Sequence, residues 1–233
     1  MGQSAGSLAA QAYSNNISST FSADRVSIIP DSYIGVFPPN SQGPLIYNFG
    51  ACSTDVLTPS LQKLCLAQEL TLQDLMLEYL AATPSIPFSF IQSKTDTTQI
   101  SYYIALAVSV GQNPIMTENM FYTQASDIMA QYNVYPNFLV YLVDGSQHTY
   151  TPLKVYYTAG PDGARDTSTN STMLHDWVDL YPTHHGDIVN TICDGDAVSP
   201  DSEIASRATR VPLFGNNYCR TDVYPKSFED TLP

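Results

Sequence analysis

The residues best suited to chemistry begin with the pentapeptide Gly2-Gln3-Ser4-Ala5-Gly6. G-x-S-x-G is the pattern of a strained turn between a strand and a helix, on which a serine presents its hydroxyl to an acyl carbon. The amide of Ala5 would then face the oxyanion that forms when the hydroxyl attacks. The pattern predicts that Ser4 is a nucleophile and Ala5 an oxyanion-hole donor. A flexible glycine-rich N-terminus is the alternative interpretation.

Two further residues stand where a serine nucleophile needs its acid and its base. In the α/β-hydrolase order, the acid follows a later strand and the histidine follows a strand later still. Asp96 comes shortly after the apolar run 87–92, and His148 comes after the run 138–143. His148 would take the proton of Ser4, while Asp96 would fix the imidazole tautomer and stabilise the imidazolium. The order therefore predicts a Ser4–Asp96–His148 triad.

Other interpretations of these residue types stay open. An aspartate that begins a helix is commonly an N-cap, and a histidine in a loop is commonly just exposed. Asp31, which follows another apolar run, is an alternative candidate for the acid. His184, His185 and Asp187 could suggest a metal site, but adjacent histidines project differently and no third ligand is evident. We expect no metal and no cofactor, and we interpret His175 as structural.

The elements that must position these residues are short apolar runs alternating with amphipathic segments. The runs are bounded by turn residues, as buried parallel strands are. This alternation predicts an α/β fold, a partial α/β-hydrolase with a mostly parallel sheet flanked by helices. The expected strands span 25–29, 87–92 and 138–143, the expected helices 72–82, 99–110, 118–132 and 171–180, and the expected loops 38–59 and 194–233.

Composition limits the classes of partner. The chain has 233 residues and a formal net charge of −13, from 9 basic and 22 acidic side chains. Nucleic-acid binding rests on clustered Lys and Arg, and no such cluster is present. No apolar stretch approaches the roughly 18 residues that a membrane-spanning helix needs. We therefore expect neither a nucleic-acid partner nor a membrane span, and the oligomeric state stays open.

The cysteines and the glycosylation sequons favour an extracellular protein. None of the cysteines forms a C-x-x-C pair, so a zinc ribbon or a thioredoxin-like site is disfavoured. An even count suggests two disulfides, for which pairing of neighbours in sequence is the simplest arrangement; four buried free thiols are the alternative. Two N-x-S/T sequons add to the same tendency. The cysteines are Cys52, Cys65, Cys193 and Cys219, and the sequons stand at Asn16 and Asn170.

Five segments together resemble one family. They are G-Q-S-A-G at 2–6, I-P-D-S-Y at 29–33, I-P-F-S-F-I-Q-S-K-T-D-T-T-Q at 86–99, D-G-S-Q-H-T-Y at 144–150 and L-H-D-W at 174–177. Through them the chain resembles the pectin acetylesterase and Notum-like group of α/β-hydrolases, from residue 2 to about residue 195. The resemblance implies a secreted carboxylesterase that acts on acyl groups carried by polysaccharides or proteins.

Carried over to this chain, the resemblance assigns the nucleophile to Ser4, the acid to Asp96 and the base to His148. It places Asp31 and Ser32 at the wall of the substrate pocket. Residues 1–195 would form the C-terminal part of a catalytic domain, and 196–233 an irregular extension packed on it. The family also has an N-terminal half that supplies early strands and one oxyanion donor. We therefore expect a fragment or truncated gene model that is weakly active or inactive alone.

The expected function is hydrolysis of acyl esters, of the acetyl class, on a polysaccharide or a similar extracellular substrate. An acylated glycan is accordingly the expected partner. Two alternatives stay open. One is a protein that keeps the hydrolase scaffold without catalysis, and the other is a serine hydrolase that cleaves a polyester or a peptide bond.

Overall fold

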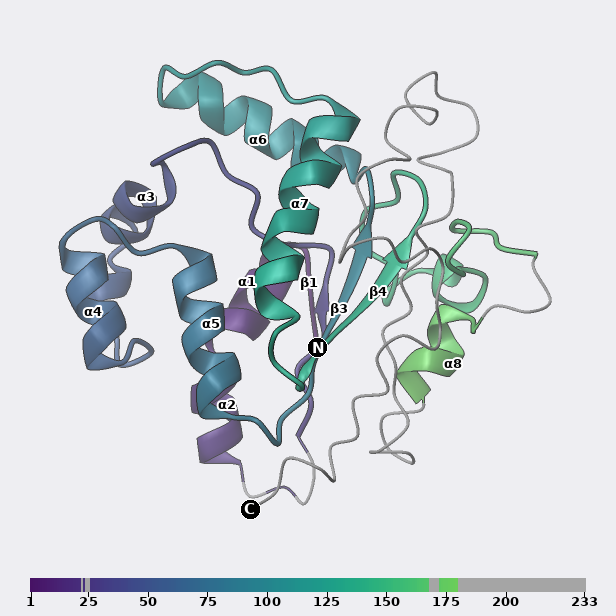
Figure 1. The fold of residues 1–233 in the computed structure, drawn as a ribbon, viewed down its shortest axis with the longest axis horizontal. Helices are drawn as coiled ribbons and strands as arrows, with labels where there is room; N and C mark the ends of the chain where they lie inside the picture. Colours follow the sequence, from purple (N-terminus) through teal and green to yellow (C-terminus); the bar gives the residue numbers. More distant parts are fainter. Residues whose placement is uncertain (22, 24–25, 168–171, 180–233) are drawn as a thin grey trace.

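A computed structural model of the chain describes residues 1–21, 23, 26–167 and 172–179 (Figure 1). Within these residues the strands form one sheet, in which every neighbouring pair is parallel and the order is β1-β2-β3-β4. The structure confirms the predicted α/β class with a parallel sheet between helices. The strands are β1 (Gly2–Gln3), β2 (Pro30–Asp31), β3 (Phe88–Ser93) and β4 (Phe138–Val143).

Helices cover both faces of this sheet. In Figure 1, α1, α5 and α7 lie on one side of the strands and α8 lies on the other. The helices are α1 (Ala5–Ala12), α2 (Ser14–Thr20), α3 (Gln42–Asn48), α4 (Pro59–Leu66), α5 (Leu72–Ala82), α6 (Thr97–Ser109), α7 (Glu118–Tyr132) and α8 (Leu174–Asp179), with short 3-10 helices η1 (Ala51–Ser53) and η2 (Lys154–Tyr157). None of the helices in the described part of the chain is long and apolar enough to cross a membrane.

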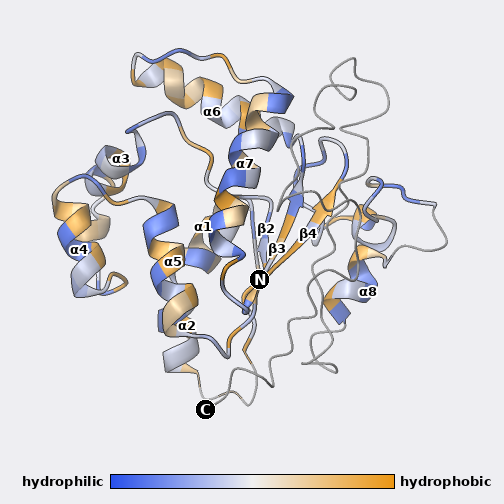
Figure 2. Ribbon diagram, in the orientation of Figure 1, coloured by the Kyte–Doolittle hydropathy of each residue, from blue (hydrophilic) through white to orange (hydrophobic). Residues whose placement is uncertain are grey.

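Strand β4 is buried on both faces, as its apolar sequence predicts. Successive side chains of a strand point to opposite faces of the sheet. Phe138 and Val140 accordingly join the larger hydrophobic core, whereas Leu139 and Tyr141 join a second core with Trp177 of α8. Figure 2 shows β4 as hydrophobic along its length, while the helices carry both hydrophobic and hydrophilic residues. The continuous apolar run is therefore that of a central strand.

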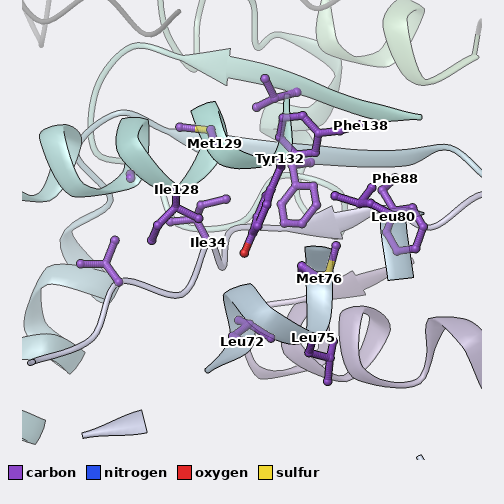
Figure 3. Close-up of a cluster of buried hydrophobic side chains, with 14 of the residues drawn as sticks. Ile34, Leu72, Leu75, Met76, Leu80, Phe88, Ile128, Met129, Tyr132 and Phe138 are labelled. Carbon is purple, nitrogen blue, oxygen red and sulfur yellow. The ribbon is translucent and has the colours of Figure 1, made fainter. Parts of the chain in front are cut away.

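The larger core lies between the sheet and the helices α5 and α7. In Figure 3, the ring of Tyr132 lies among side chains of α5, α7 and the strands. Tyr132, Met76 and Phe138 are each fully buried. Burial of side chains of this size stabilises the fold by about 1.5–3 kcal/mol each. This packing holds β3 and β4 in place beneath the loops that carry the candidate residues.

The start of helix α5 is fixed by a local signal in the sequence. Thr71 and Asp74 form a capping box, in which the Thr71 Oγ1 accepts from the Asp74 amide and the Asp74 carboxylate accepts from the Thr71 amide. The helix spans the predicted residues 72–82, and α7 likewise spans the predicted 118–132. A clear apolar stripe and a defined start therefore fix both elements.

The first predicted strand, 25–29, is wrong in its bounds. Ile28 makes an isolated parallel bridge with Phe88, and the paired strand β2 begins at Pro30, one residue beyond the predicted strand. Proline is tolerated as the first residue of a strand, where its missing amide removes little of the ladder. The strand at 87–92 and the helix at 99–110 are each displaced by one or two residues from the prediction.

The predicted loop 38–59 is also wrong, because it contains α3 and η1 and ends at the start of α4. Cys52 and Cys65 form a disulfide with a Cα–Cα distance of 5.5 Å, which joins η1 to α4. The predicted pairing of these two cysteines is confirmed, and free thiols at these positions are excluded.

Some predicted features fall outside the described residues. The second cysteine pair, Cys193 and Cys219, lies there, as does the sequon at Asn170. The candidate metal residues His184, His185 and Asp187 also lie there. So do the whole expected loop 194–233 and the expected extension 196–233. Asn16 lies within α2.

Candidate active site

Ser4 occupies the turn between β1 and α1. Its φ of 52° lies in the left-handed region, which non-glycine residues rarely adopt and which costs energy unless the surroundings enforce it. The Ser4 amide donates to the backbone oxygen of Asp31 at 2.9 Å, which ties the turn to β2. A Cβ on Gly2 would lie 1.9 Å from the Gly6 oxygen, so the turn requires glycine at position 2. A Cβ on Gly6 would meet no described atom within 4 Å.

Asp96 begins α6 directly beyond β3, and its side chain has two roles. Its Oδ1 accepts from the amides of Thr98 and Gln99, each at 3.0 Å, so the residue is an N-cap. Its Oδ2 accepts from the Gln99 side-chain amide at 2.9 Å and also contacts His148. The carboxylate is fully buried and lies at the N-terminus of α6, where it accepts from backbone amides that have no partner within the helix.

His148 bridges the acid and the serine. Its Nδ1 lies 2.8 Å from Asp96 Oδ2, and its Nε2 lies 2.9 Å from Ser4 Oγ. In the tautomer with the proton on Nδ1, His148 donates from Nδ1 to Asp96 Oδ2. Its Nε2 is then free to accept the proton of Ser4. The histidine side chain is 19% exposed, whereas that of Asp96 is buried. The structure therefore brings together the three residues that the sequence singled out.

Backbone hydrogen bonds join the loop that carries Asp96 to the loop that carries His148. The ladder between β3 and β4 continues beyond the strands, because Lys94 donates to the Val143 oxygen and Thr95 donates to the Gly145 oxygen, both at 3.0 Å. The hydroxyl of Thr95 donates to the same Gly145 oxygen at 2.8 Å. The acid and the base are therefore carried by one continuous piece of sheet.

A shallow recess of about 180 Å³ opens at the serine and the histidine. Ala5, the first residue of α1, lines it, and the first amides of a helix have no intrahelical partner. Burial raises the pKa of Tyr33 well above its usual value, and the adjacent Tyr102 adds to the shift, so Tyr33 offers this recess a neutral hydroxyl. The recess is lined by Ser4, Ala5, Leu8, Tyr33, Thr98, Gln99, Tyr102 and His148.

A second, larger cavity of about 420 Å³ lies beside the first. Ala5 and Leu8 of α1 line both cavities. The remaining walls of the second cavity are mostly apolar and come from α1, α3, α5 and the segments between them. Leu8 therefore lines both the small recess at Ser4 and the larger apolar cavity.

Asp31 and Ser32 do not occupy the positions that the resemblance predicts. Both residues are fully buried and neither lines the recess, so the structure corrects their placement at the pocket wall. The Asp31 carboxylate accepts from the amides of Tyr150 and Thr151, at 2.9 and 2.8 Å, rather than from His148. The alternative assignment of Asp31 as the acid is thus disfavoured by its contacts.

Comparisons of the chain with models of protein families, with curated proteins and with solved structures found no match. The assignment of a function therefore rests on the geometry of this chain.

Sequence patterns missed two features around the site. Gln99 orients the acid, because its side-chain amide donates to both Asp96 Oδ2 and Gln92 Oε1.

The second feature is a buried ion pair. Lys94 Nζ lies 2.5 Å from Asp144 Oδ1, and both side chains are buried. Burial raises the pKa of Asp144 to about 6, although Lys94 acts against the shift. The sequence did contain a signal for this pair, because Lys94 and Asp144 each stand just after one of the two apolar runs, 87–92 and 138–143.

His175 lies on α8, where the predicted helix 171–180 is reduced to residues 174–179 among those described. Its Nε2 is 3.1 Å from Asp176 Oδ1, and its ring packs against Tyr156 and Tyr157. These contacts agree with a structural residue.

Proposed function

We propose that the chain is a serine carboxylesterase that hydrolyses short acyl esters, of the acetyl class, on a polysaccharide or a similar extracellular substrate. One observation carries the proposal. A serine on a strained turn, a histidine and a buried aspartate form an unbroken series of hydrogen bonds, with Ser4 Oγ 2.9 Å from His148 Nε2 and His148 Nδ1 2.8 Å from Asp96 Oδ2. This is the arrangement by which a serine hydroxyl becomes a nucleophile.

In the first half of the reaction, Ser4 Oγ forms a bond to the acyl carbon while His148 Nε2 takes its proton. Asp96 stabilises the imidazolium that results. The amide of Ala5 donates to the oxygen on which negative charge develops. Collapse of this intermediate breaks the ester bond, and His148 returns the proton to the leaving alcohol.

In the second half, water takes the place of the alcohol. His148 removes a proton from the water, whose oxygen attacks the acyl–Ser4 ester. Collapse of the second intermediate releases the carboxylic acid and gives the proton back to Ser4.

The size of the recess supports a short acyl group. Pockets for drug-sized ligands have volumes of about 300–1,000 Å³. The recess at Ser4 is smaller, about 180 Å³, and its walls mix hydroxyl, amide and apolar groups. The disulfide between Cys52 and Cys65 supports an oxidising compartment, in agreement with a secreted protein.

The proposal is tested by covalent labelling. A fluorophosphonate probe reacts with serines that an adjacent base activates, so we expect one adduct per chain, located at Ser4 by peptide mass mapping. Ser4→Ala should abolish the adduct. Ser7→Ala, in the first turn of α1 directly after Ser4, is the matched control and should label as the unchanged chain does. If the folded chain accepts no probe, a scaffold without catalysis is favoured over the esterase.

A second prediction concerns the length of the acyl group. Leu8→Ala should widen the connection between the recess at Ser4 and the adjacent apolar cavity, because Leu8 lines both of them. If two more methylenes of a long acyl chain are buried in the enlarged space, they stabilise its transition state by about 1.6 kcal/mol, which corresponds to about fifteenfold in kcat/KM. We therefore expect the ratio of kcat/KM for an octanoyl over an acetyl aryl ester to rise at least about tenfold.

The control for this prediction is Leu64→Ala on α4, which also removes a half-buried leucine but lines neither cavity. Its acyl-length ratio should match that of the unchanged chain. An equal change of the ratio in both variants would show that the effect is a general loosening rather than a widened connection.

A further inference from the structure

Asp31 and Ser32 lie between the serine and the loop of the histidine, and both are fully buried. Asp31 ends β2 and Ser32 follows it; the register pairs Gly2 with Pro30 and Gln3 with Asp31. Through its backbone oxygen, Asp31 accepts from the Ser4 amide at 2.9 Å. One residue of β2 is therefore already fixed to the turn of the nucleophile.

The side chain of the same aspartate holds the segment that follows His148. Asp31 Oδ2 accepts from the amides of Tyr150 and Thr151, at 2.9 and 2.8 Å, and from the Thr151 hydroxyl at 2.7 Å. Bonds from neutral donors to a carboxylate are shorter and stronger than bonds between neutral groups. Gln3 of β1 adds a bond from its side-chain amide to the Thr151 hydroxyl at 3.1 Å. The segment is thus anchored to β1, which leads into Ser4, and to β2 beside it.

Ser32 holds Thr149, the residue directly after His148. Its hydroxyl donates to Asp31 Oδ1 and accepts from the Thr149 amide, both at 2.9 Å. Thr149 has a φ of 60°, in the left-handed region that a β-branched residue rarely adopts. Such a conformation persists only where the surrounding contacts enforce it. Ser32 and Asp31 supply those contacts within three residues of His148.

We infer that Asp31 and Ser32 are positioning residues that hold His148 in line between Asp96 and Ser4, an inference that rests on the proposed triad. Asp31 fixes the nucleophile through its backbone and the loop of the base through its carboxylate. Ser32 transmits this restraint to Thr149. A displacement of a catalytic group by about 1 Å can cost about 10²-fold in rate. Neither residue touches the recess in which the substrate would react.

The test compares Ser32→Ala with Ser89→Ala. Ser89 is a matched control, because it is fully buried on β3 and its hydroxyl has no hydrogen-bond partner in the described part of the chain. Ser32→Ala should lower kcat for a short-chain aryl ester between about tenfold and 10²-fold, with KM within about twofold. Ser89→Ala should leave kcat within about twofold. Asp31→Asn, which keeps the shape of the side chain but removes its charge, should lower kcat in the same way as Ser32→Ala.

A second readout does not depend on activity. The proton on His148 Nδ1 that faces Asp96 should give a low-field resonance, which is assigned by its loss in His148→Gln. In Ser32→Ala this resonance should broaden or move, whereas in Ser89→Ala it should not change. Circular dichroism and the thermal midpoint establish that each variant is folded.

The outcomes separate this inference from the proposed function. A folded Ser32→Ala variant with unchanged kcat and an unchanged His148 resonance would overturn the inference even if the protein is an esterase. If the unchanged chain hydrolyses no ester, the His148 Nδ1 proton resonance is the only measurement that tests the positioning role. Its change in Ser32→Ala then supports the positioning role, and its constancy refutes it.

Discussion

Asp96→Asn should lower kcat for a short-chain aryl ester by about 10⁴-fold while KM changes little, as expected for loss of the acid of a serine triad. The substitution keeps the shape of the side chain. Depending on how the asparagine amide is turned, either its NH2 group or its uncharged carbonyl oxygen then faces the His148 ring in place of the carboxylate oxygen. Neither alternative stabilises the imidazolium of His148 as the carboxylate at 2.8 Å does. An amide nitrogen facing the ring would also favour the wrong tautomer.

The fold should survive this substitution. Asparagine is as good an N-cap as aspartate, so the bonds from the Thr98 and Gln99 amides can be kept. Asp74→Asn is the matched control, because Asp74 also lies in the first turn of a helix, α5, and takes part in its capping box. The control should retain kcat within about twofold. If kcat in Asp96→Asn falls by less than about tenfold, Asp96 is not the acid.

Lys94→Met should lower the free energy of unfolding by about 3–5 kcal/mol at pH 8, because it leaves the buried Asp144 carboxylate without its partner. Lys94 and Asp144 side chains are only 2% and 5% exposed. Asp162 and Asp166 raise the pKa of Asp144 further and so cannot replace the lysine. Urea unfolding followed by fluorescence measures the loss.

The loss should shrink as the pH falls. The pKa of Asp144 is raised by burial from 3.8 to about 6, with Lys94 lowering it, so the variant should have a still higher value. A carboxyl whose pKa is raised in the folded protein favours folding at low pH, and this contribution is lost as the pH rises through the folded pKa. At pH 5 Asp144 therefore takes up a proton in the variant, and the destabilisation should be smaller than at pH 8.

Two further variants make this test specific. Lys94→Met combined with Asp144→Leu removes both charges and should recover most of the stability, since apolar replacement of a buried pair is often neutral. Lys154→Met removes an exposed lysine and should change the free energy of unfolding by no more than about 0.5 kcal/mol. Equal losses at pH 5 and pH 8 in Lys94→Met would contradict the role of Asp144.

The sequence predicted best those elements whose pattern depends on neighbours along the chain. Strand β4 and the helices α5 and α7 have the expected bounds, because buried runs and apolar stripes are local signals. The short helices α3 and α4 were not predicted. Helix α3 lies in a region rich in Pro, Gly, Asn and Ser, which the sequence pattern favours as a loop. Thr58 and Pro59 were nevertheless a usable signal for α4, as an N-cap followed by proline at the first helical position.

The candidate triad could be predicted because the order of strand ends is itself a geometric rule. Parallel strands bring their C-terminal ends to one edge, so Asp96 and His148 had to lie near each other. The part of Asp31 in anchoring Thr151 could not be predicted, because the two residues are 120 positions apart. A buried carboxylate that accepts amides from a distant loop leaves no periodic pattern in the sequence.

The walls of the small recess come from α1, from the segment after β2, from α6 and from His148, and none of them from β3 or β4. Apart from Ser4 and His148 themselves, the residues that line the recess therefore lie outside the two strands that precede Asp96 and His148. If the proposed function holds, Leu8 of α1 and Tyr102 of α6 can be exchanged to suit another ester while β3, β4 and Gln99, which contacts the acid, stay as they are. The architecture lets selectivity evolve, or be engineered, without rebuilding the reactive machinery.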